Sequence, residues 1–284
     1  MSTSKTSNAS STTTAELRQT AEDAARLAGK LLSEKFGGQR TIEYKGGIDL
    51  VTDADRAAEA AILELLRARH PDHAILAEES GASGTRMGAQ TDGGHRWIID
   101  PLDGTTNYSH RLPHFSVSIA VEDAQGLLAG VVYDPIRDEL FAATRGEGAA
   151  LNGLPIRVSG AATLDKALLC TGFPYDVREN PEAPLGLFNR LVRKARGMRR
   201  FGSAALDLAY IACGRYDGYF EFGLKPWDVA AGALLVREAG GLITRIDGAA
   251  LDLHRGDVIA GGAAIHAALH AETVPVLEAV GWRP

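Results

Sequence analysis

Two segments near the start of the chain carry apolar residues at helical spacing, and each begins at a residue typical of a helix start. The first repeat follows Thr13 and Glu16, whose spacing is that of a capping box, and stops at Gly37-Gly38. The second begins near Thr52 and ends at His70-Pro71, where proline cannot continue a helix. We therefore predict two amphipathic helices ahead of the first strand.

The next segments favour strands. Apolar runs predict a short buried strand over 74–77 and another that ends at Ile99. From Phe115 to Ser159, short β-rich runs separated by Gly, Asp or Pro predict an antiparallel meander. Its predicted strands cover residues 116–121, 127–133, 139–144 and 156–159.

After Leu168 the pattern alternates between helices and strands. We predict helices over 187–196, 204–213, 227–239 and 263–280, and strands over 198–201, 218–222, 242–246 and 258–260. An antiparallel half followed by an α/β half predicts a mixed fold, α+β and α/β, of layered sheets and helices. Because no repeat or linker interrupts it, we expect one domain over 15–284, with subregions of about 15–160 and 161–284.

Composition narrows the class of protein. The chain has 284 residues, 45% hydrophobic and 23% charged, which is ordinary for a globular protein. A net charge of −6 argues against nucleic acid as a general partner. No apolar run approaches the roughly 20 residues needed to cross a membrane. The Ser/Thr-rich residues 1–14 lack the apolar core of a signal peptide and predict a disordered tail, so we expect a cytoplasmic protein.

Residues 97–107, WIIDPLDGTTN, carry the strongest chemical signal. The apolar run reads as a strand that breaks at Asp100-Pro101 and leaves Asp100 and Asp103 on one tight turn, with the Leu102 carbonyl between them. These are hard oxygen ligands of the kind that Mg²⁺ prefers. Gly104-Thr105 follows at once and can hold a phosphate on backbone N–H groups. The segment therefore predicts metal-assisted phosphoryl chemistry.

Other carboxylates could join this site, but each also has a structural explanation. Glu78 follows the strand over 74–77 and could be solvated. Asp55 lies three residues after Thr52, where an acid caps a helix, and Asp228 lies at a helix start, where the helix dipole favours an acid. Taken together, these explanations would have to reproduce the spacing of a metal site by chance, so we favour the functional interpretation.

Four separated blocks of the chain resemble the Mg²⁺-dependent, lithium-sensitive inositol monophosphatase family, and most of all its bacterial members. The likeness covers essentially the whole chain after the tail and keeps the order of the blocks. The blocks are DLVTDAD at 49–55, AEES at 77–80, WIIDPLDGTTN at 97–107, and WDVAAG at 227–232 continuing to EAGG at 238–241.

The resemblance implies a metal site and a mechanism. It assigns two or three Mg²⁺ ions to five metal-binding residues: Glu78, Asp100, Asp103, Asp228 and the backbone oxygen of Leu102. The catalytic residues would be Glu78 and Thr105 paired with Asp55, which would orient or deprotonate an attacking water without a covalent intermediate. The amides of Gly104 and Thr105 would hold the phosphate.

The resemblance also implies substrate contacts and an architecture. Gly202, Ser203, Ala204, Glu221 and Asp228 would contact the substrate, although Ser203 could equally be the N-cap of the helix that follows it. Lys225 receives no role because family members vary there. The family fold is a five-layer αβαβα sandwich, and we expect a homodimer. The implied reaction is hydrolysis of inositol 1-phosphate; histidinol phosphate, fructose 1,6-bisphosphate and 3′-phosphoadenosine 5′-phosphate are the alternative substrates.

Two rival interpretations differ in mechanism or in class. A haloacid-dehalogenase phosphatase needs a nucleophilic Asp two residues before its acid–base Asp, whereas Asp100 and Asp103 are three apart, so we reject it. A catalytically silent Mg²⁺-binding interaction protein would lack a ligand, and none is missing here. We therefore predict an enzyme that acts on a small phosphomonoester.

Overall fold

The computed structural model describes residues 13–38, 42–44, 50–80 and 94–282. The helices of this part of the chain are α1 (Thr14–Lys35), α2 (Asp53–Arg69), α3 (Thr105–Ser109), α4 (Glu182–Leu191), α5 (Ala204–Ala212), α6 (Pro226–Glu238) and α7 (Ala263–Ala279). Its first strands are β1 (Ile42–Tyr44), β2 (Leu50–Thr52), β3 (Ala74–Ala77), β4 (Arg96–Asp103), β5 (Ser116–Asp123), β6 (Gly126–Asp134), β7 (Glu139–Thr144), β8 (Gly148–Leu151) and β9 (Leu154–Pro155). The later strands are β10 (Leu168–Thr171), β11 (Gly197–Arg199), β12 (Gly218–Leu224), β13 (Leu242–Arg245) and β14 (Gly256–Gly261).

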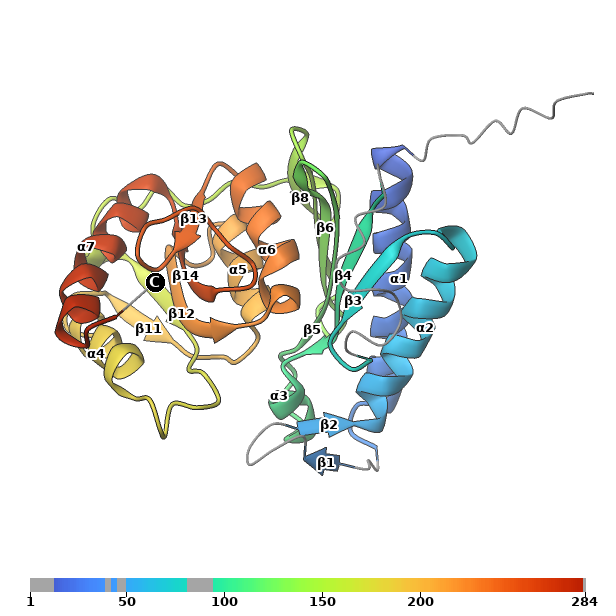
Figure 1. Cartoon of the computed structure of the whole chain (residues 1–284), viewed down its shortest axis with the longest axis horizontal. Helices are drawn as coiled ribbons and strands as arrows, with labels where there is room; N and C mark the ends of the chain where they lie inside the picture. Colours follow the sequence, from blue (N-terminus) through green and yellow to red (C-terminus); the bar gives the residue numbers. More distant parts are fainter. Residues whose placement is uncertain (1–12, 39–41, 45–49, 81–93, 283–284) are drawn as a thin grey trace, which may run out of the picture.

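Helices and sheets alternate in layers (Figure 1). From right to left the picture shows α1 with α2, the sheet of β3 to β9, α5 with α6, the sheet of β10 to β14, and α4 with α7. Within the described residues the two large sheets have seven and five strands, and β1 with β2 forms a separate antiparallel pair. The expected mixed fold of sheets and helices is confirmed.

The seven-stranded sheet has the order β3-β4-β5-β6-β7-β8-β9. It is antiparallel apart from the parallel pair β3 and β4, so the predicted meander is confirmed. The predicted strand over 156–159 is wrong, because β8 and β9 form the last hairpin instead. Asn152 and Gly153 have φ of 48° and 79° at its turn, and an Asn-Gly pair is a hairpin signal that our prediction missed.

The five-stranded sheet has the order β11-β10-β12-β14-β13. β10 pairs in parallel with β11 and β12, whereas β14 is antiparallel to β12 and β13. We missed β10, which is a short run without alternation. The predicted helix over 187–196 lies at 182–191 instead, because Pro184 falls in the first turn of α4, where no intrahelical N–H is required.

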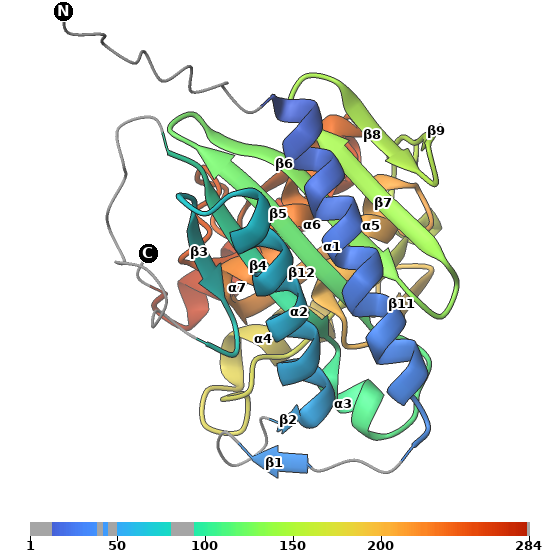
Figure 2. The ribbon, with the colours of Figure 1, turned by 90° about the vertical axis from the view of Figure 1, so that its right-hand side faces the viewer.

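The two N-terminal helices follow their predicted caps. Thr13 and Glu16 form the capping box of α1, and Thr52 and Asp55 form that of α2. Because Thr13 caps α1 and Thr14 lies within it, the predicted tail is two residues too long, and its other residues lie outside the described ranges. Figure 2 shows α1 and α2 lying across one face of the seven-stranded sheet.

Apolar clusters fill the interfaces between the layers, and one of them lies on both sides of the α5–α6 layer. Trp97 and Ile119 of the seven-stranded sheet are fully buried under α1 and α2. On the opposite face of that sheet, Gly130 lets α6 approach closely, since a Cβ there would lie 3.0 Å from the Cα of Ala231. α6 contacts both sheets and therefore links the two halves of the chain. None of the described helices has the length and apolar character needed to span a membrane.

Candidate active site

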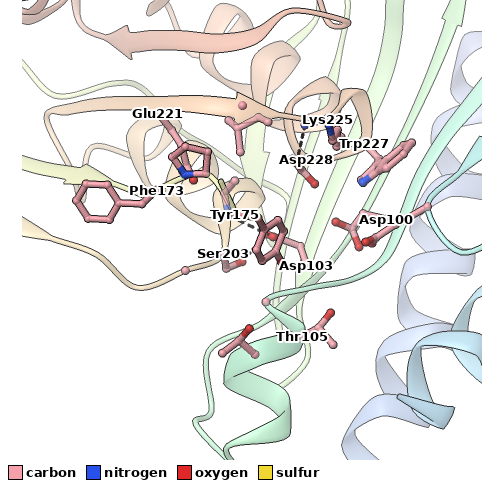
Figure 3. Close-up of a pocket in the computed structure, with 18 of the residues that line it drawn as sticks. Asp100, Asp103, Thr105, Phe173, Tyr175, Ser203, Glu221, Lys225, Trp227 and Asp228 are labelled. Atoms are coloured by element: carbon pink, nitrogen blue, oxygen red, sulfur yellow. Dashed lines mark hydrogen bonds between the residues drawn. The ribbon is translucent and has the colours of Figure 1, made fainter. Parts of the chain in front are cut away.

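A cavity of about 300 Å³ lies where the ends of β4 and β12 face each other (Figure 3). It collects residues from five segments of the chain. From the first half they are Glu78, Asp100, Leu102, Asp103, Gly104, Thr105 and Thr106, and from the second half Phe173, Pro174, Tyr175, Arg200, Gly202, Ser203, Ala204, Glu221, Phe222, Gly223, Leu224, Lys225, Trp227 and Asp228. Every predicted site residue except Asp55 lines this cavity.

A bulge at the end of β4 places the two aspartates of the turn. Asp100 pairs with Ser118 of β5 and Asp103 with Ser116, so two residues of β4 are left opposite one of β5. Pro101 occupies this bulge, where its missing N–H costs no ladder hydrogen bond. The strand therefore bulges at Asp100-Pro101 and continues to Asp103, rather than ending at the proline as we predicted.

Glu78 reaches the same end of the sheet through the parallel pairing of β3 with β4. Its backbone N–H donates to the carbonyl oxygen of Ile99 at 3.2 Å, which sets it beside Asp100. Asp100 is buried and accepts a hydrogen bond from the N–H of Leu102 at 3.0 Å. Burial, followed by the charge of Glu78, raises the pKa of Asp100 well above its ordinary value. The carboxylates of Glu78 and Asp100 therefore interact electrostatically.

The turn after Asp103 requires glycine. Gly104 has a φ of 98°, and a Cβ there would lie 3.2–3.3 Å from the carbonyl oxygens of His114 and Gly202. Gly104 is the N-cap of α3 and Thr105 is its first residue, so neither amide has an earlier helix carbonyl to bind. These N–H groups are available to an anion in the cavity.

Thr105 is linked to a buried carboxylate behind the cavity. Its hydroxyl lies 3.0 Å from both Asp55 Oδ1 and the carbonyl oxygen of Leu102. The other oxygen of Asp55 accepts hydrogen bonds from the N–H and the hydroxyl of Thr52. Burial raises the pKa of Asp55. Asp55 does not line the cavity and can act there only through Thr105.

Asp103 is held by the start of α5. Its carboxylate accepts hydrogen bonds from the hydroxyl of Ser203 at 2.5 Å and from the amides of Ala205 and Ala204 at 2.8 and 3.3 Å. Ser203 is the N-cap of α5 by position, but its side chain makes no capping bond to the helix and binds Asp103 instead. Sequences 100 residues apart are thus joined at the site, and the polar groups of Ser203 and Ala204 are directed at Asp103.

Asp228 and Glu221 come from the β12–α6 segment. Asp228 Oδ2 accepts a hydrogen bond from the N–H of Lys225 at 2.7 Å, and Pro226 begins the helix. Glu221 Oε2 accepts one from the hydroxyl of Tyr219 at 2.5 Å. Burial raises the pKa of Asp228 to about 8 and that of Glu221 to about 7. Figure 3 shows Asp228 facing Asp100 and Asp103 across the cavity.

The donor set fits a hard divalent cation. Glu78, Asp100, Asp103, Asp228 and the Leu102 carbonyl line one cavity. Burial and neighbouring carboxylates favour the protonated forms of the three aspartates unless a cation offsets the charge. In the part of the chain that the structure describes, no three His, Cys, Asp or Glu side chains are already arranged so that they could hold a metal ion. Three of these acids already accept hydrogen bonds from the protein: Asp100 from the Leu102 N–H, Asp103 from Ser203, and Asp228 from the Lys225 N–H through Oδ2 alone.

Sequence reasoning missed part of the cavity wall. Phe173, Pro174 and Tyr175 lie between β10 and α4 in a segment without a motif, and Arg200 adds a positive charge just before Gly202. Only the position of these residues in the fold identifies them. Thr52 had a signal, its capping box with Asp55, but sequence reasoning assigned it no part in the predicted Thr105–Asp55 pair.

The chain is similar to known proteins over most of its length. The model of the inositol monophosphatase family matches residues 13–279. An inositol-1-monophosphatase of Synechocystis is 49% identical over 247 residues, 87% of this chain and 84% of that protein. The Nus factor SuhB of Escherichia coli K12 is 48% identical over 241 residues, 84% of this chain and 88% of that protein. The structure of an inositol monophosphatase from Anabaena is similar with a TM-score of 0.82 and 42% identity, covering 94% of this chain and 99% of that one.

Proposed function

The chain belongs to the inositol monophosphatase family, and on that premise we propose that it is a Mg²⁺-dependent phosphatase that hydrolyses a polyol phosphomonoester such as inositol 1-phosphate. The observation that carries the proposal is the single cavity that unites four carboxylates with the anion-accessible amides of Gly104 and Thr105. A cation site beside an anion site is the requirement of metal-assisted phosphoryl transfer.

The metal site would consist of Glu78, Asp100, Asp103, Asp228 and the Leu102 carbonyl oxygen. Two or three Mg²⁺ ions bound there would supply charge for the leaving alkoxide and lower the pKa of a bound water. The protein's contribution is to hold the ligands in place: the α5 amides fix Asp103 and the Lys225 amide fixes Asp228. We expect lithium to compete for the same ligands.

Thr105 would position the attacking water. Because its hydroxyl donates to Asp55, the lone pairs of Thr105 Oγ1 are free to accept a hydrogen bond from a water in the cavity. A proton leaving that water could pass through Thr105 towards Asp55, with Glu78 as the other acceptor at the same end of the sheet. The amides of Gly104 and Thr105 would hold the phosphate.

The other wall of the cavity would recognise the alcohol part of the substrate. Glu221 accepts hydrogen bonds and can bind ring hydroxyls, while Gly202, Ser203 and Ala204 form the floor next to Asp103. A polyol fits such a wall because each hydroxyl can donate to a carboxylate oxygen. Histidinol phosphate, fructose 1,6-bisphosphate and 3′-phosphoadenosine 5′-phosphate remain alternative substrates. We also propose a homodimer, which light scattering would test.

Phosphate release from a substrate panel tests the proposal. The whole chain would be assayed with inositol 1-phosphate, histidinol phosphate and fructose 1,6-bisphosphate, with Mg²⁺ and with EDTA. We expect release from inositol 1-phosphate that requires Mg²⁺. If no member of the panel were hydrolysed under any Mg²⁺ concentration, the enzymatic proposal would be overturned and a silent Mg²⁺-binding protein would be favoured.

A second candidate function is that of a Nus factor. It is supported by 48% identity to Escherichia coli SuhB across 84% of this chain, which equals the likeness to the Synechocystis enzyme within one percentage point. Expression of this chain, and of its Asp228→Asn variant, in Escherichia coli lacking SuhB tests it. Rescue by both would indicate a Nus role independent of catalysis, whereas failure of both would exclude that role for this chain.

A further inference from the structure

The Glu221 carboxylate accepts a hydrogen bond from a buried tyrosine. Tyr219 lies two residues earlier in β12, so both side chains point to the same face of the sheet. Tyr219 is fully buried, and its hydroxyl donates to Glu221 Oε2 at 2.5 Å. Since a hydrogen bond to a charged group is stronger than a neutral one, this contact restrains the carboxylate.

The Glu221 carboxylate also packs against the backbone of Gly172. Gly172 follows β10, whose Thr171 pairs with Phe220 of β12. A Cβ built on Gly172 would lie 2.0 Å from Glu221 Oε1 and 2.3 Å from its Cδ. The carboxylate therefore rests directly on the backbone of Gly172, and any side chain there must displace it.

A second buried acid, Asp207, does not bind the Tyr219 hydroxyl. Asp207 of α5 is buried on this face, and neither of its oxygens has a hydrogen-bond partner among the described residues. Burial, followed by the charge of Glu221, raises the pKa of Asp207 well above its ordinary value. The hydroxyl of Tyr219 donates to Glu221, and the Asp207 oxygens take no part in that contact.

We propose that Tyr219 and Gly172 are positioning residues that fix Glu221 as the acceptor for a substrate hydroxyl, and that they thereby set the preference for polyol phosphates. The inference rests on the proposed phosphatase function. Tyr219 binds one oxygen of Glu221 and leaves lone pairs of the carboxylate for the ligand. A restrained acceptor also avoids the cost of ordering a flexible side chain upon binding.

Removal of the Tyr219 hydroxyl is the first test. Tyr219→Phe keeps the ring in its buried place and removes only the donor, and Tyr216→Phe is the matched control on a second buried tyrosine. Both would be assayed with inositol 1-phosphate and with p-nitrophenyl phosphate, which has no ring hydroxyl. We expect Tyr219→Phe to raise KM for inositol 1-phosphate about tenfold, with little change in kcat or in either constant for p-nitrophenyl phosphate.

The outcomes separate a positioning role from a structural one. An equal loss with both substrates, or a lower kcat with unchanged KM, would overturn the inference, and so would an equal effect of Tyr216→Phe. A parent protein that hydrolyses p-nitrophenyl phosphate but discriminates against polyol phosphates would overturn it while leaving a phosphatase. A parent that hydrolyses neither compound would overturn the proposed function, and the inference with it.

A double-mutant cycle tests Gly172 independently of Tyr219. Gly172→Ala should raise KM for inositol 1-phosphate because the new methyl group displaces the Glu221 carboxylate. Glu221→Asp shortens the side chain by one methylene and makes room for that group. We therefore expect Gly172→Ala to have a smaller effect on KM in the Glu221→Asp background than in the parent. Additive effects would show that Gly172 does not act through Glu221.

Discussion

The two walls of the cavity differ in how they are built. The first wall, Glu78 with residues 100–105, comes from neighbouring strands, and its polar groups lie within one turn of β4. The second wall, residues 173–175, 202–204, 221–225 and 227–228, comes from segments that meet only through the packing of α5, α6 and β12. In the proposed function, the first wall would act on the phosphate and the second would contact the rest of the substrate. The comparison suggests that chemistry is encoded locally and recognition by the whole fold.

Substitution of Asp228 should have the largest effect and should affect the functions of both walls. Asp228 belongs to the second wall but faces Asp100 and Asp103 of the first (Figure 3). Asp228→Asn keeps the shape and removes one charge from the shared metal site, so we expect kcat/KM to fall at least about 10³-fold for every substrate. Asp53→Asn is the control, since Asp53 also lies in a first helical turn but pairs with Lys35 at the surface. Near-normal turnover of a folded Asp228→Asn protein at ordinary Mg²⁺ would contradict its role as a ligand.

Substitution of Thr105 tests the chemical role that we propose for the first wall. Thr105→Ala removes the hydroxyl that donates to Asp55 but keeps the backbone amide that we propose for phosphate binding. We expect kcat to fall by about 10²–10⁴ with much less change in KM, while Thr105→Ser keeps most of the activity. Steady-state kinetics with melting temperatures would check this. Full activity of Thr105→Ala would leave water activation to Glu78 and the metal site.

Substitution of Glu221 tests the recognition role that we propose for the second wall, and its expected effect is smaller. Glu221→Gln retains an oxygen that can accept from Tyr219 but loses the charge that strengthens a bond to a substrate hydroxyl. We expect KM for inositol 1-phosphate to rise about tenfold, with kcat nearly unchanged. Initial-rate measurements over a range of substrate concentrations decide this, and an unchanged KM would remove Glu221 from substrate recognition.

The smallest effect concerns the opposite end of β4, where stability rather than chemistry is at stake. His73 accepts a hydrogen bond from Trp97 Nε1 at 3.1 Å and stacks on His70, with ring centroids 4.7 Å apart. Burial lowers the pKa of His73 to about 4. The unfolded chain, with a histidine pKa near 6.5, therefore binds protons that the folded chain does not, so this contribution to stability is complete above about pH 6.5 and is lost as the pH falls towards 4.

Melting temperatures at pH 7.5 and 5.5 check this expectation. His73→Gln should lose less stability between the two values than the parent, by roughly 2–4 °C. Activity relative to the parent at pH 7.5 should not change. An identical drop in both proteins would show that His73 stays neutral in both states or that other histidines determine the slope.

Local signals predicted the first wall and much of the fold. The capping boxes of α1 and α2 and the meander of β5 to β7 follow from patterns within a few residues, as does the turn at Gly104. The bulge at Pro101 was misread as a strand end because proline tells only that an N–H is missing. Whether a neighbouring strand tolerates that gap depends on β5, which no local pattern reveals.

The second wall shows what sequence could not provide. Ser203 was assigned to substrate or to a helix cap, whereas its hydroxyl binds Asp103, 100 residues earlier in the chain. Gly172 carried no signal, because its importance comes from the Glu221 carboxylate that rests on it. Such contacts arise from the packing of β10 and α5 against β12 and β4, and only a three-dimensional arrangement defines them.

The most direct test of this account is the selectivity of two variants, one from each wall. The ratio of kcat/KM for inositol 1-phosphate to that for p-nitrophenyl phosphate would be measured for the parent, Thr105→Ala and Glu221→Gln. The account predicts that Thr105→Ala lowers both values by the same factor and leaves the ratio unchanged, whereas Glu221→Gln lowers the ratio about tenfold. A changed ratio in Thr105→Ala, or an unchanged ratio in Glu221→Gln, would contradict the division of the cavity into a chemical and a recognition wall.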